Sequence, residues 1–525
     1  MLYMLTTILT TAIGIASPYI IGDFLDTLIS GADMGAIMWF CIIFGGLNVL
    51  KLAKGYVTSI IYVKMQAKMS YELNMDTIRH IQNLSLTYAN RNDGAYLTQR
   101  VSGDSVNVIV FGITILQSVL TNTLTLVIPF IVLLHMNWRI TLLFGGFLAA
   151  YALLYLVFKN SLFNASLIHT EANNKFFTSL FEQLNYVKSV KINSIQAEIN
   201  KRADKSFDSL QDTTIRRQKI SYMYSSSEKV IATVAQITLF VVGGIQFING
   251  NFTIGMFTVF TAYFNMMMSA GKYFVGLGAS YQAALVAYHR LLEITGQRQE
   301  SNGSINLADI STISLDNVCF SYDLATQNKH VLNNFSKLFE KGKLYGITGE
   351  NGSGKTTLVS LILGLYKDEF QGSISYNGID IKMIDIKSAR RQLISFAEQE
   401  PMLWNDSILF NLVFNNDDAA IDKQRLNKYI DILNMREFVQ EKGLDYTIDD
   451  RNTNTSGGEK QKIAILKTLY QNAPVMIFDE PTSALDESTS KLFMDYLLAV
   501  KKDKIIILIT HDNSIKNVCD ELVIV

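Results

Sequence analysis

Long apolar stretches recur six times in the first 285 residues of the chain. They lie near 2–28, 36–60, 107–136, 139–159, 228–248 and 254–280. Each has about the 20 residues that a helix needs to cross the hydrocarbon core of a bilayer. No charged leader, apolar core and cleavage site can be told apart at the start, so residues 2–28 are interpreted as a span and not as a signal peptide. The pattern predicts a membrane bundle of six helices.

The connections between these stretches differ in length and charge. Those after the first, third and fifth spans are short, whereas 61–104 and 160–227 are long, polar and free of proline. Sixteen Lys and Arg residues lie in or beside the long connections, and the short ones contain only Arg139. Because Lys and Arg near span ends are retained in the cytoplasm, we expect both long connections and both termini there. The long connections have no apolar pattern for a core of their own, which favours helices that continue out of the membrane over separate soluble domains.

After about residue 300 the pattern changes to short β-type runs that alternate with helical ones. This alternation predicts an α/β domain. The segment 297–306 is polar and contains Gly and Ser, which is typical of a linker. The expected division is a transmembrane domain at 1–296, a linker at 297–306 and an α/β domain at 307–525.

The composition is an average over these two parts. The mean hydropathy of +0.19 is high for a soluble enzyme, yet 46 Lys and Arg and 47 Asp and Glu are too many for a chain buried wholly in lipid. The same balance leaves no basic excess, which excludes nucleic acid as a partner bound through phosphate neutralisation. Three cysteines cannot form a disulfide framework. Five prolines in 525 residues suit long unbroken helices.

A phosphate-binding motif of the form G-x-x-x-x-G-K-[ST] follows the β-type run 344–348 and precedes an apolar helical run. It reads Gly349-Glu350-Asn351-Gly352-Ser353-Gly354-Lys355-Thr356, with Thr357 next. Glycines let backbone N–H groups surround a triphosphate, and the helix directs its positive end at the phosphates. We expect Lys355 to reach the β- and γ-phosphates and Thr356 to hold Mg²⁺. The alternative, a chance Gly-rich turn, fits the strand and helix around it less well.

A second β-type run, 475–478, ends in two acids. Asp479 can hold Mg²⁺, and Glu480 can polarise the water that attacks the γ-phosphate. The alternative is a pair of solvated acids at a strand end, which this position downstream of a phosphate loop disfavours.

Between these motifs the segment Asn454–Gln461, which contains Ser456, Gly457, Gly458 and Glu459, closely resembles the L-S-G-G-Q signature of ABC transporters. Further family elements occur in order. Tyr322 resembles the adenine platform, Gln399 the Q-loop glutamine, residues 483–486 the D-loop and His511 the switch histidine. Seven such elements lie within about 190 residues. The departures are Thr455 for the usual Leu and Glu459 for the usual Gln.

The resemblance implies a fold, a chemistry and an assembly. The fold is an exporter-type half-transporter of type IV: a membrane α-helical bundle of six helices with long cytoplasmic extensions, fused to an α/β P-loop NTPase domain that carries an α-helical subdomain. ATP and Mg²⁺ are the implied cofactors. ATP is contacted by Tyr322, the phosphate loop, Gln399 and the signature residues Ser456–Glu459, whereas Thr356, Gln399 and Asp479 hold the metal. Lys355, Glu480 and His511 are the implied catalytic residues.

In this family the signature of one nucleotide domain completes the ATP site of another, so the resemblance also implies a dimer with two sandwiched ATPs. All the motifs occur on one chain, which favours a homodimer, and a heterodimer stays open. The implied activity is ATP-driven export of an amphipathic peptide, lipid or drug-like molecule across a cell membrane, most simply a bacterial cytoplasmic membrane. An ATP-gated channel or regulator, and an importer, are the alternatives on the same scaffold.

Two cations lie late in the second apolar stretch. Lys51 and Lys54 are about one helical turn apart. Such residues either line a cavity, which would favour an anionic group on the cargo, or extend to the membrane interface, which is the commoner case.

Overall fold

The computed structural model describes residues 2–31, 33–92, 94–322, 330–414, 421–449, 455–483 and 485–525. The chain forms two compact units. The first comprises Met1–Arg79 and Gly94–Gly296, and the second comprises His80–Asp93 and Gln297–Val525. The second unit is therefore assembled from two separate segments of the sequence.

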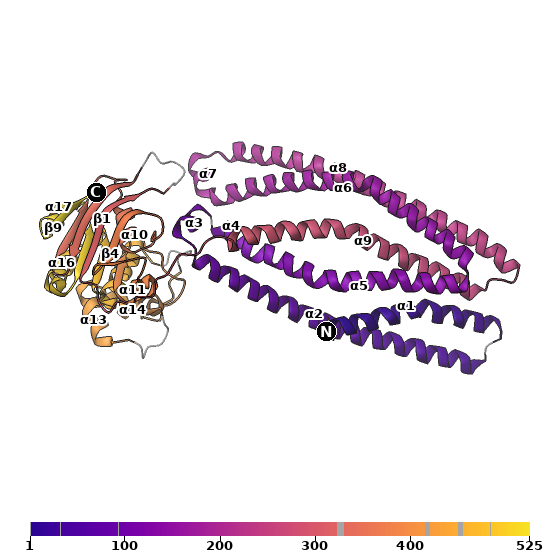
Figure 1. Cartoon of the computed structure of the whole chain (residues 1–525). Helices are drawn as coiled ribbons and strands as arrows, with labels where there is room; N and C mark the ends of the chain where they lie inside the picture. Colours follow the sequence, from indigo (N-terminus) through magenta and orange to yellow (C-terminus); the bar gives the residue numbers. More distant parts are fainter. Residues whose placement is uncertain are drawn as a thin grey trace. The chain divides into compact units, whose positions relative to one another are not determined.

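The first unit is helical (Figure 1). Its elements are α1 (Leu2–Ile29), α2 (Met34–Gln82), α4 (Gly94–Gln99), the π-helical turn η1 (Arg100–Asp104), α5 (Ser105–Met136), α6 (Trp138–Asn185), α7 (Val187–Asn193), α8 (Gln196–Ile248) and α9 (Ile254–Thr295). Helices α6 and α8 pack together along their length, and α9 packs against α1 and α5. The prediction of helices that continue beyond the apolar stretches is confirmed by α2, α6 and α8, which have 49, 48 and 53 residues.

Five helical segments among the described residues are long and apolar enough to cross a membrane. They are Leu2–Ile29, Met34–Gln82, Tyr96–Met136, Trp138–Asn185 and Gln196–Ile248. The sixth expected span, 254–280, lies within α9, which is not among the five. Its polar Asn265 and Lys272 lower its apolarity, and residues such as Phe260 and Met267 are buried among neighbouring helices. A membrane crossing by α9 stays a prediction.

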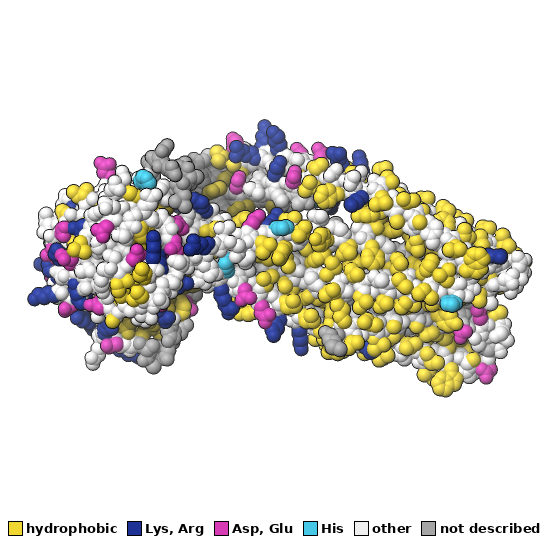
Figure 2. Space-filling view, viewed as in Figure 1, with side chains coloured by type: hydrophobic (Ala, Val, Ile, Leu, Met, Phe, Trp, Pro, Cys, Tyr) yellow, Lys and Arg dark blue, Asp and Glu magenta, His cyan; other side chains and the backbone are white. Residues whose placement is uncertain are grey.

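Large apolar side chains cover the outside of the long helices. Leu52, Val157 and Ile248 are 75, 74 and 83% exposed, and Figure 2 shows hydrophobic side chains gathered over this helical unit. Exposed apolar surface of this extent is unfavourable in water. Burial in lipid removes that cost.

Helices α1 and α9 approach closely at two glycines. A Cβ on Gly255 would clash with the Gly22 carbonyl oxygen and with the carboxylate of Asp26. Asp26 accepts hydrogen bonds from Gly255 N at 2.7 Å and from Thr253 Oγ1 at 2.5 Å. Small residues let helix backbones meet in this way in membranes, so this contact joins the end of α1 to the start of α9.

The second unit contains two sheets. The first is antiparallel, in the order β2-β1-β4-β5, with β1 (Thr312–Phe320), β2 (Leu332–Glu340), β4 (Gln371–Tyr376) and β5 (Ile379–Asp380). The second is parallel, in the order β6-β7-β8-β3-β9, with β3 (Leu344–Thr348), β6 (Ile394–Ala397), β7 (Val475–Asp479), β8 (Ile505–Ile509) and β9 (Glu521–Ile524). The near-continuous apolar runs of β3, β7 and β8 are buried, as expected for a parallel sheet covered on both faces.

Helices cover these sheets in two groups. The larger are α10 (Lys355–Ile362), α13 (Lys423–Ile432), α15 (Gly457–Gln471) and α16 (Glu487–Val500), and the shorter are α11 (Ile386–Gln392), α12 (Ile408–Val413), α14 (Arg436–Lys442), η3 (Lys501–Asp503) and α17 (Asn513–Lys516). One apolar core joins α10 and α11 to both sheets. A second joins α12, α13, α15 and α16 to the parallel sheet, which matches the α-helical subdomain expected from the resemblance.

The segment His80–Asp93 packs on the second unit through α3 (Leu86–Arg91). Leu86 contacts the apolar core, and Thr87 Oγ1 donates a hydrogen bond to Glu369. Asn83 accepts from Glu300 N at 2.7 Å. Arg91 Nη2 donates to the carbonyl oxygen of Tyr322 at 3.3 Å. The tip of the first long connection is thus an integral part of the second unit.

We predict that Gly255→Ala destabilises the helical unit, because its methyl group has no space between α1 and α9. Overpacking of this kind costs about 1–3 kcal/mol. The thermal unfolding midpoint of the detergent-solubilised protein, followed by fluorescence, should fall. Gly276→Ala on the same helix is the control, since its Cβ would meet no described atom within 4 Å. Equal midpoints for the two variants would contradict the close contact.

Candidate nucleotide-binding and catalytic site

The expected site residues meet where parallel strands end. Gln399 follows β6, Asp479 ends β7 and Glu480 follows it, His511 follows β8 and Gly349 follows β3. In the sheet Asp479 is paired with Ile509, and Ile347 is paired with Ile509 from the other side. Carboxyl ends of parallel strands share one edge, and ligands of α/β sheets bind outside it. The fold therefore brings together residues that are about 30 to 160 positions apart in sequence.

The phosphate loop is shaped by glycines that adopt left-handed backbone angles. Gly352 and Gly354 have φ of 81° and 108°, which other residues adopt only with strain. Lys355 Nζ donates to the carbonyl oxygens of Gly349 and Glu350, both at 2.9 Å, so the ammonium lies over the loop. Ser353 Oγ is buried and has no hydrogen-bond partner among the described residues. A phosphate oxygen would supply that partner.

The loop leads directly into α10. Thr356 is exposed in its first turn, where a metal could be reached, whereas Thr357 is buried. Thr357 Oγ1 shares a 2.8 Å hydrogen bond with the Tyr322 hydroxyl. Asn351, also in the loop, is exposed. The first turn of α10 thus carries one hydroxyl facing outward and one that fixes Tyr322.

Tyr322 stands at the edge of an aromatic cluster. Its ring lies edge-on to Phe320 and Tyr366, with centroids 5.0 and 5.7 Å away. The side chain remains 43% exposed. A ring that is held by its neighbours and still accessible suits the stacking role expected from the resemblance.

Glu480 is the most constrained residue of the site. Its φ of 45° places a non-glycine residue in the left-handed region, a conformation that costs about 1–3 kcal/mol and is typical of functional sites. Its carboxylate accepts a hydrogen bond from Gln399 Nε2 at 2.7 Å, and His511 Nε2 lies 3.6 Å from the other oxygen. Three of the expected residues, from three strand ends, are therefore in direct contact.

Gln461 is a site residue that the sequence analysis does not identify. It is 4% exposed on α15, and its Nε2 donates to the Glu480 carbonyl oxygen at 2.9 Å. Ser483 Oγ donates to Gln461 Oε1 at 3.1 Å and to the same Glu480 carbonyl at 2.9 Å. The sequence signal that could have identified Gln461 is a polar residue on the apolar, buried face of the predicted helix. Gln461 connects the signature helix to the strained backbone of Glu480.

The signature segment forms the start of α15. Ser456 Oγ accepts from Glu459 N at 3.2 Å, and the Glu459 carboxylate accepts from Ser456 N at 2.6 Å, which is a capping box. Partial burial would raise the pKa of Glu459, but these hydrogen bonds and the charge of Lys442 keep it below its ordinary value. The Glu that replaces the usual Gln thus stabilises the turn that carries Gly457 and Gly458. Asn454 of the signature and Ala484 of the D-loop lie outside the described residues.

The residues present fit a magnesium ion. Burial and the neighbouring charge of Glu480 raise the pKa of Asp479 to about 6, while Lys355 opposes the shift. A carboxylate destabilised in this way gains from a divalent cation beside it. Hydroxyl, amide and carboxylate oxygens of Thr356, Gln399 and Asp479 are ligands that Mg²⁺ prefers. The buried Ser353 oxygen without a partner, described above, is a further polar group for the nucleotide that accompanies the ion.

Lys51 and Lys54 both lie on α2, in the helical unit. Lys51 is exposed, and its Nζ lies 3.9 Å from the position of a Cβ on Gly14 of α1. It lines a small cavity with residues of α1 such as Ser17 and Ile20. Lys54 is half-buried. Cargo binding by these two lysines stays a prediction.

Sequence and structure comparisons identify known proteins that resemble this chain. Residues 1–270 match the family described as "ABC transporter transmembrane region", and residues 332–483 match the family "ABC transporter". The chain is 26% identical to the transport/processing ATP-binding protein ComA of Streptococcus pneumoniae, over 99% of this chain and 72% of that protein. It is 25% identical to the lactococcin-G-processing and transport ATP-binding protein LagD of Lactococcus lactis, over 98% and 73% of the two chains.

Two further relatives extend the comparison. The ATP-dependent lipid A-core flippase of Haemophilus ducreyi is 25% identical over 97% of this chain and 87% of that protein. The solved structure of a bacterial Atm1-family ABC exporter with ATP bound matches with a TM-score of 0.82 and 18% identity, over 100% of this chain and 92% of the other. At that identity the structural match establishes the fold.

The helical unit and the strand-end site define a membrane transporter with a fused P-loop ATPase. The chain belongs to the ABC transporter family, as an exporter-type half-transporter. It is a multi-pass membrane protein that binds ATP and couples its hydrolysis to export, and its half-transporter fold implies a dimer.

We predict that Gln461→Ala lowers kcat for ATP hydrolysis about tenfold while the KM for ATP changes little. The side chain holds the Glu480 backbone and touches no part of the expected nucleotide contacts, so loss of one hydrogen bond acts on turnover. Steady-state ATPase kinetics measure the split.

Gln471→Ala is the matched control for this prediction. Gln471 lies on the same helix and also donates to backbone carbonyls, those of Arg391 and Ile394, but it has no contact with Glu480. Equal loss of kcat in both variants would show that Gln461 acts only through the stability of α15.

Proposed function

We propose that this protein is an ATP-driven exporter that moves an amphipathic cargo out of the cytoplasm or the inner leaflet. The observation that carries the proposal is the complete hydrolytic set on one chain, with Glu480 in contact with both Gln399 and His511. A gate opened by ATP binding has no need of efficient turnover, so this set favours a pump over a channel or regulator. Two relatives are named for lactococcin G and for lipid A-core, and these cargoes support a peptide or a lipid over a small ion.

The residues have separate roles in hydrolysis. Lys355 and the loop Gly349–Thr356, with Thr357 behind it, bind the phosphates, and Tyr322 stacks on the adenine. Glu480 accepts the proton of the attacking water, and His511 positions the γ-phosphate. Gln399 is bound to Glu480 here and must exchange this contact when nucleotide and metal enter. Thr356, Gln399 and Asp479 would hold Mg²⁺, which neutralises charge that develops on the phosphate oxygens.

Two copies are needed for a complete ATP site. Ser456, Gly457, Gly458 and Glu459 of one copy would close on the ATP held by the other, so that two ATPs are sandwiched in the dimer. A homodimer is the simplest assembly, because every required motif is on this chain. ATP drives the transition because it binds the closed dimer more tightly than the open one.

The domains would divide this work. Residues 1–296 would form the cargo pathway by alternating access, and 307–525 the nucleotide domain, joined by 297–306. The nucleotide domain and both termini would be cytoplasmic, with the protein in a bacterial cytoplasmic membrane. The excess of Lys and Arg in the long connections supports this orientation.

We predict that Glu480→Gln leaves ATP affinity within about threefold of the unsubstituted protein and lowers turnover at least 100-fold. The amide keeps the shape and the hydrogen bond to Gln399 but cannot accept a proton, and loss of a general base costs about 10²–10⁴ in rate. Nucleotide binding and phosphate release are measured separately.

Glu487→Gln is the control for this substitution. Glu487 is an exposed acid at the start of α16, and its variant should hydrolyse ATP at the normal rate. Retention of most activity by Glu480→Gln would refute the role of Glu480 as the base.

We predict that sealed inside-out vesicles containing the protein accumulate a labelled amphipathic peptide or lipid when ATP is added. Vesicles containing Glu480→Gln should not, because the cycle cannot be reset. Flux that runs down its gradient without hydrolysis would indicate a channel. ATP-dependent loss of preloaded cargo from the same vesicles would indicate an importer.

A further inference from the structure

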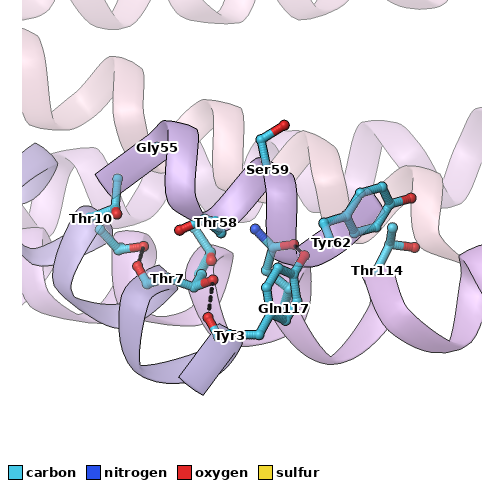
Figure 3. A pocket seen from close by; sticks show the side chains of 11 residues that line it. Tyr3, Thr7, Thr10, Gly55, Thr58, Ser59, Tyr62, Thr114 and Gln117 are labelled. Carbon is cyan, nitrogen blue, oxygen red and sulfur yellow. Dashed lines mark hydrogen bonds between the residues drawn. The ribbon is translucent and has the colours of Figure 1, made fainter. Parts of the chain in front are cut away.

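A cavity among α1, α2 and α5 of the helical unit has an unusual lining. Its volume is about 460 Å³, within the range of pockets that hold small ligands. Eleven residues line it, and all but Gly55 carry a hydroxyl or an amide. All eleven are described by the structure, and none is charged. Figure 3 shows these side chains gathered from the three helices.

Five of the six threonine hydroxyls of this cavity donate their protons to a carbonyl oxygen of their own helix. Thr7, Thr10 and Thr11 each donate to the carbonyl oxygen one turn earlier on α1, at 2.8–2.9 Å. Thr58 on α2 and Thr114 on α5 do the same, at 2.9 and 2.7 Å. A hydroxyl has one proton and two lone pairs. Each of these oxygens therefore keeps acceptor capacity for a ligand, and the lining is rich in acceptors.

The polar lining also includes Thr121, Tyr3 and Gln117. Thr121 Oγ1 is buried and has no hydrogen-bond partner among the described residues, which is costly in an apolar environment. The Tyr3 hydroxyl donates to Gln117 Oε1 and so joins α1 to α5. The Gln117 amide contains the only side-chain nitrogen of the lining. A ligand thus meets mostly acceptors on the threonines, with the Gln117 amide and the hydroxyls of Ser59, Tyr62 and Thr121 as donors.

Apolar surface alternates with these polar atoms. Every threonine carries a methyl group beside its oxygen, and the rings of Tyr3 and Tyr62 stack with centroids 6.3 Å apart. A peptide has the matching pattern, because its backbone N–H donors alternate with side chains that can be apolar. A sugar has hydroxyls around its whole edge and matches less well. A charged group would find no counter-ion among the lining residues.

We propose that this cavity binds an uncharged segment of a peptide cargo, whose backbone N–H groups donate to the threonine oxygens. The proposal rests on the proposed export function and specifies its substrate class. Lys51 lies outside the lining, in the neighbouring small cavity, so an acidic group is not required for binding at this site. The threonine oxygens accept from N–H groups, and the Gln117 amide donates to a C=O group. Together they determine the specificity of the cavity for a peptide backbone.

The test measures peptide-stimulated ATPase activity of the full-length protein in proteoliposomes. The probes are an end-blocked Ala/Leu hexapeptide, the same hexapeptide with N-methylated amides, and an alkyl glucoside. The N-methylated peptide retains the side chains and carbonyls but has lost its donors. We expect stimulation by the unmodified peptide and at least tenfold weaker stimulation by the N-methylated one.

The variant Thr58→Val/Thr121→Val removes two hydroxyls at nearly constant shape. It should raise the half-saturating concentration of the unmodified peptide about tenfold and leave that of the N-methylated peptide unchanged. Thr58→Ser keeps the hydroxyl and should retain normal peptide affinity. Thr238→Val is the matched control, since Thr238 on α8 makes the same bond to a carbonyl of its own helix but does not line the cavity. If the double variant is unstable, binding of labelled peptide to each single variant in nanodiscs gives the same comparison.

The outcomes separate the two proposals. Normal peptide affinity in the double variant, with peptide still exported, would overturn the cavity assignment and leave export standing. Equal stimulation by both peptides would overturn the role of N–H donors, and stimulation by the glucoside alone would replace peptide by a sugar-bearing cargo. Absence of stimulation and of ATP-driven transport with every probe would contradict the proposed function itself.

Discussion

A chain in hydrocarbon must satisfy its own backbone hydrogen bonds, and much of this structure follows from that constraint. It requires helices wherever the chain crosses lipid. Because only two of the five prolines lie in these helices, helices can continue well past the apolar stretches. The same constraint governs the threonines. Five of the six threonines that line the cavity donate their protons to helix carbonyls, and what these five offer a ligand is the acceptor side of each oxygen. The need to satisfy hydrogen bonds within the helices thereby determines which hydrogen bonds the cavity can offer a ligand.

The nucleotide unit follows a different rule. Its parallel sheet places the ends of β6, β7, β8 and β3 along one edge, and each end contributes one part of the site. The positions of Gln399, Glu480 and His511 are therefore set by strand register, and loop conformation adjusts them. Gln461 and Ser483 then fix the strained carbonyl of Glu480 from the helical side. We therefore expect ATP hydrolysis at this edge to depend on a buried helix contact, that of Gln461 with the Glu480 carbonyl.

Most of the features that could be predicted from the sequence depend on residues close to one another along the chain. The glycine spacing of 349–354 identifies the phosphate loop because backbone angles and spacing are local properties, and the missing prolines indicate unbroken helices for the same reason. Gln461 could not be assigned in this way, since its partner is a main-chain oxygen 19 residues away that any sequence would provide. The contact of Gly22 with Gly255 depends on two helices at opposite ends of the bundle sequence. The apolar pattern of α9 does not show how its exposed Lys272 is accommodated, because the partner is Glu228 on α8, 44 positions away in sequence.

The two-segment composition of the second unit has a consequence for how the protein can be divided. The chain passes between the units three times, after Arg79, after Asp93 and after Gly296. A cut in the linker 297–306 would therefore divide the second unit itself, whose two segments would then be held together only by the packing of His80–Asp93. Conversely, a gene fragment that begins at the linker would lack His80–Asp93, and would expose the apolar surface that Leu86 covers. The second unit is thus encoded by two separate stretches of the gene, and an exchange of the whole unit has to include the stretch for His80–Asp93.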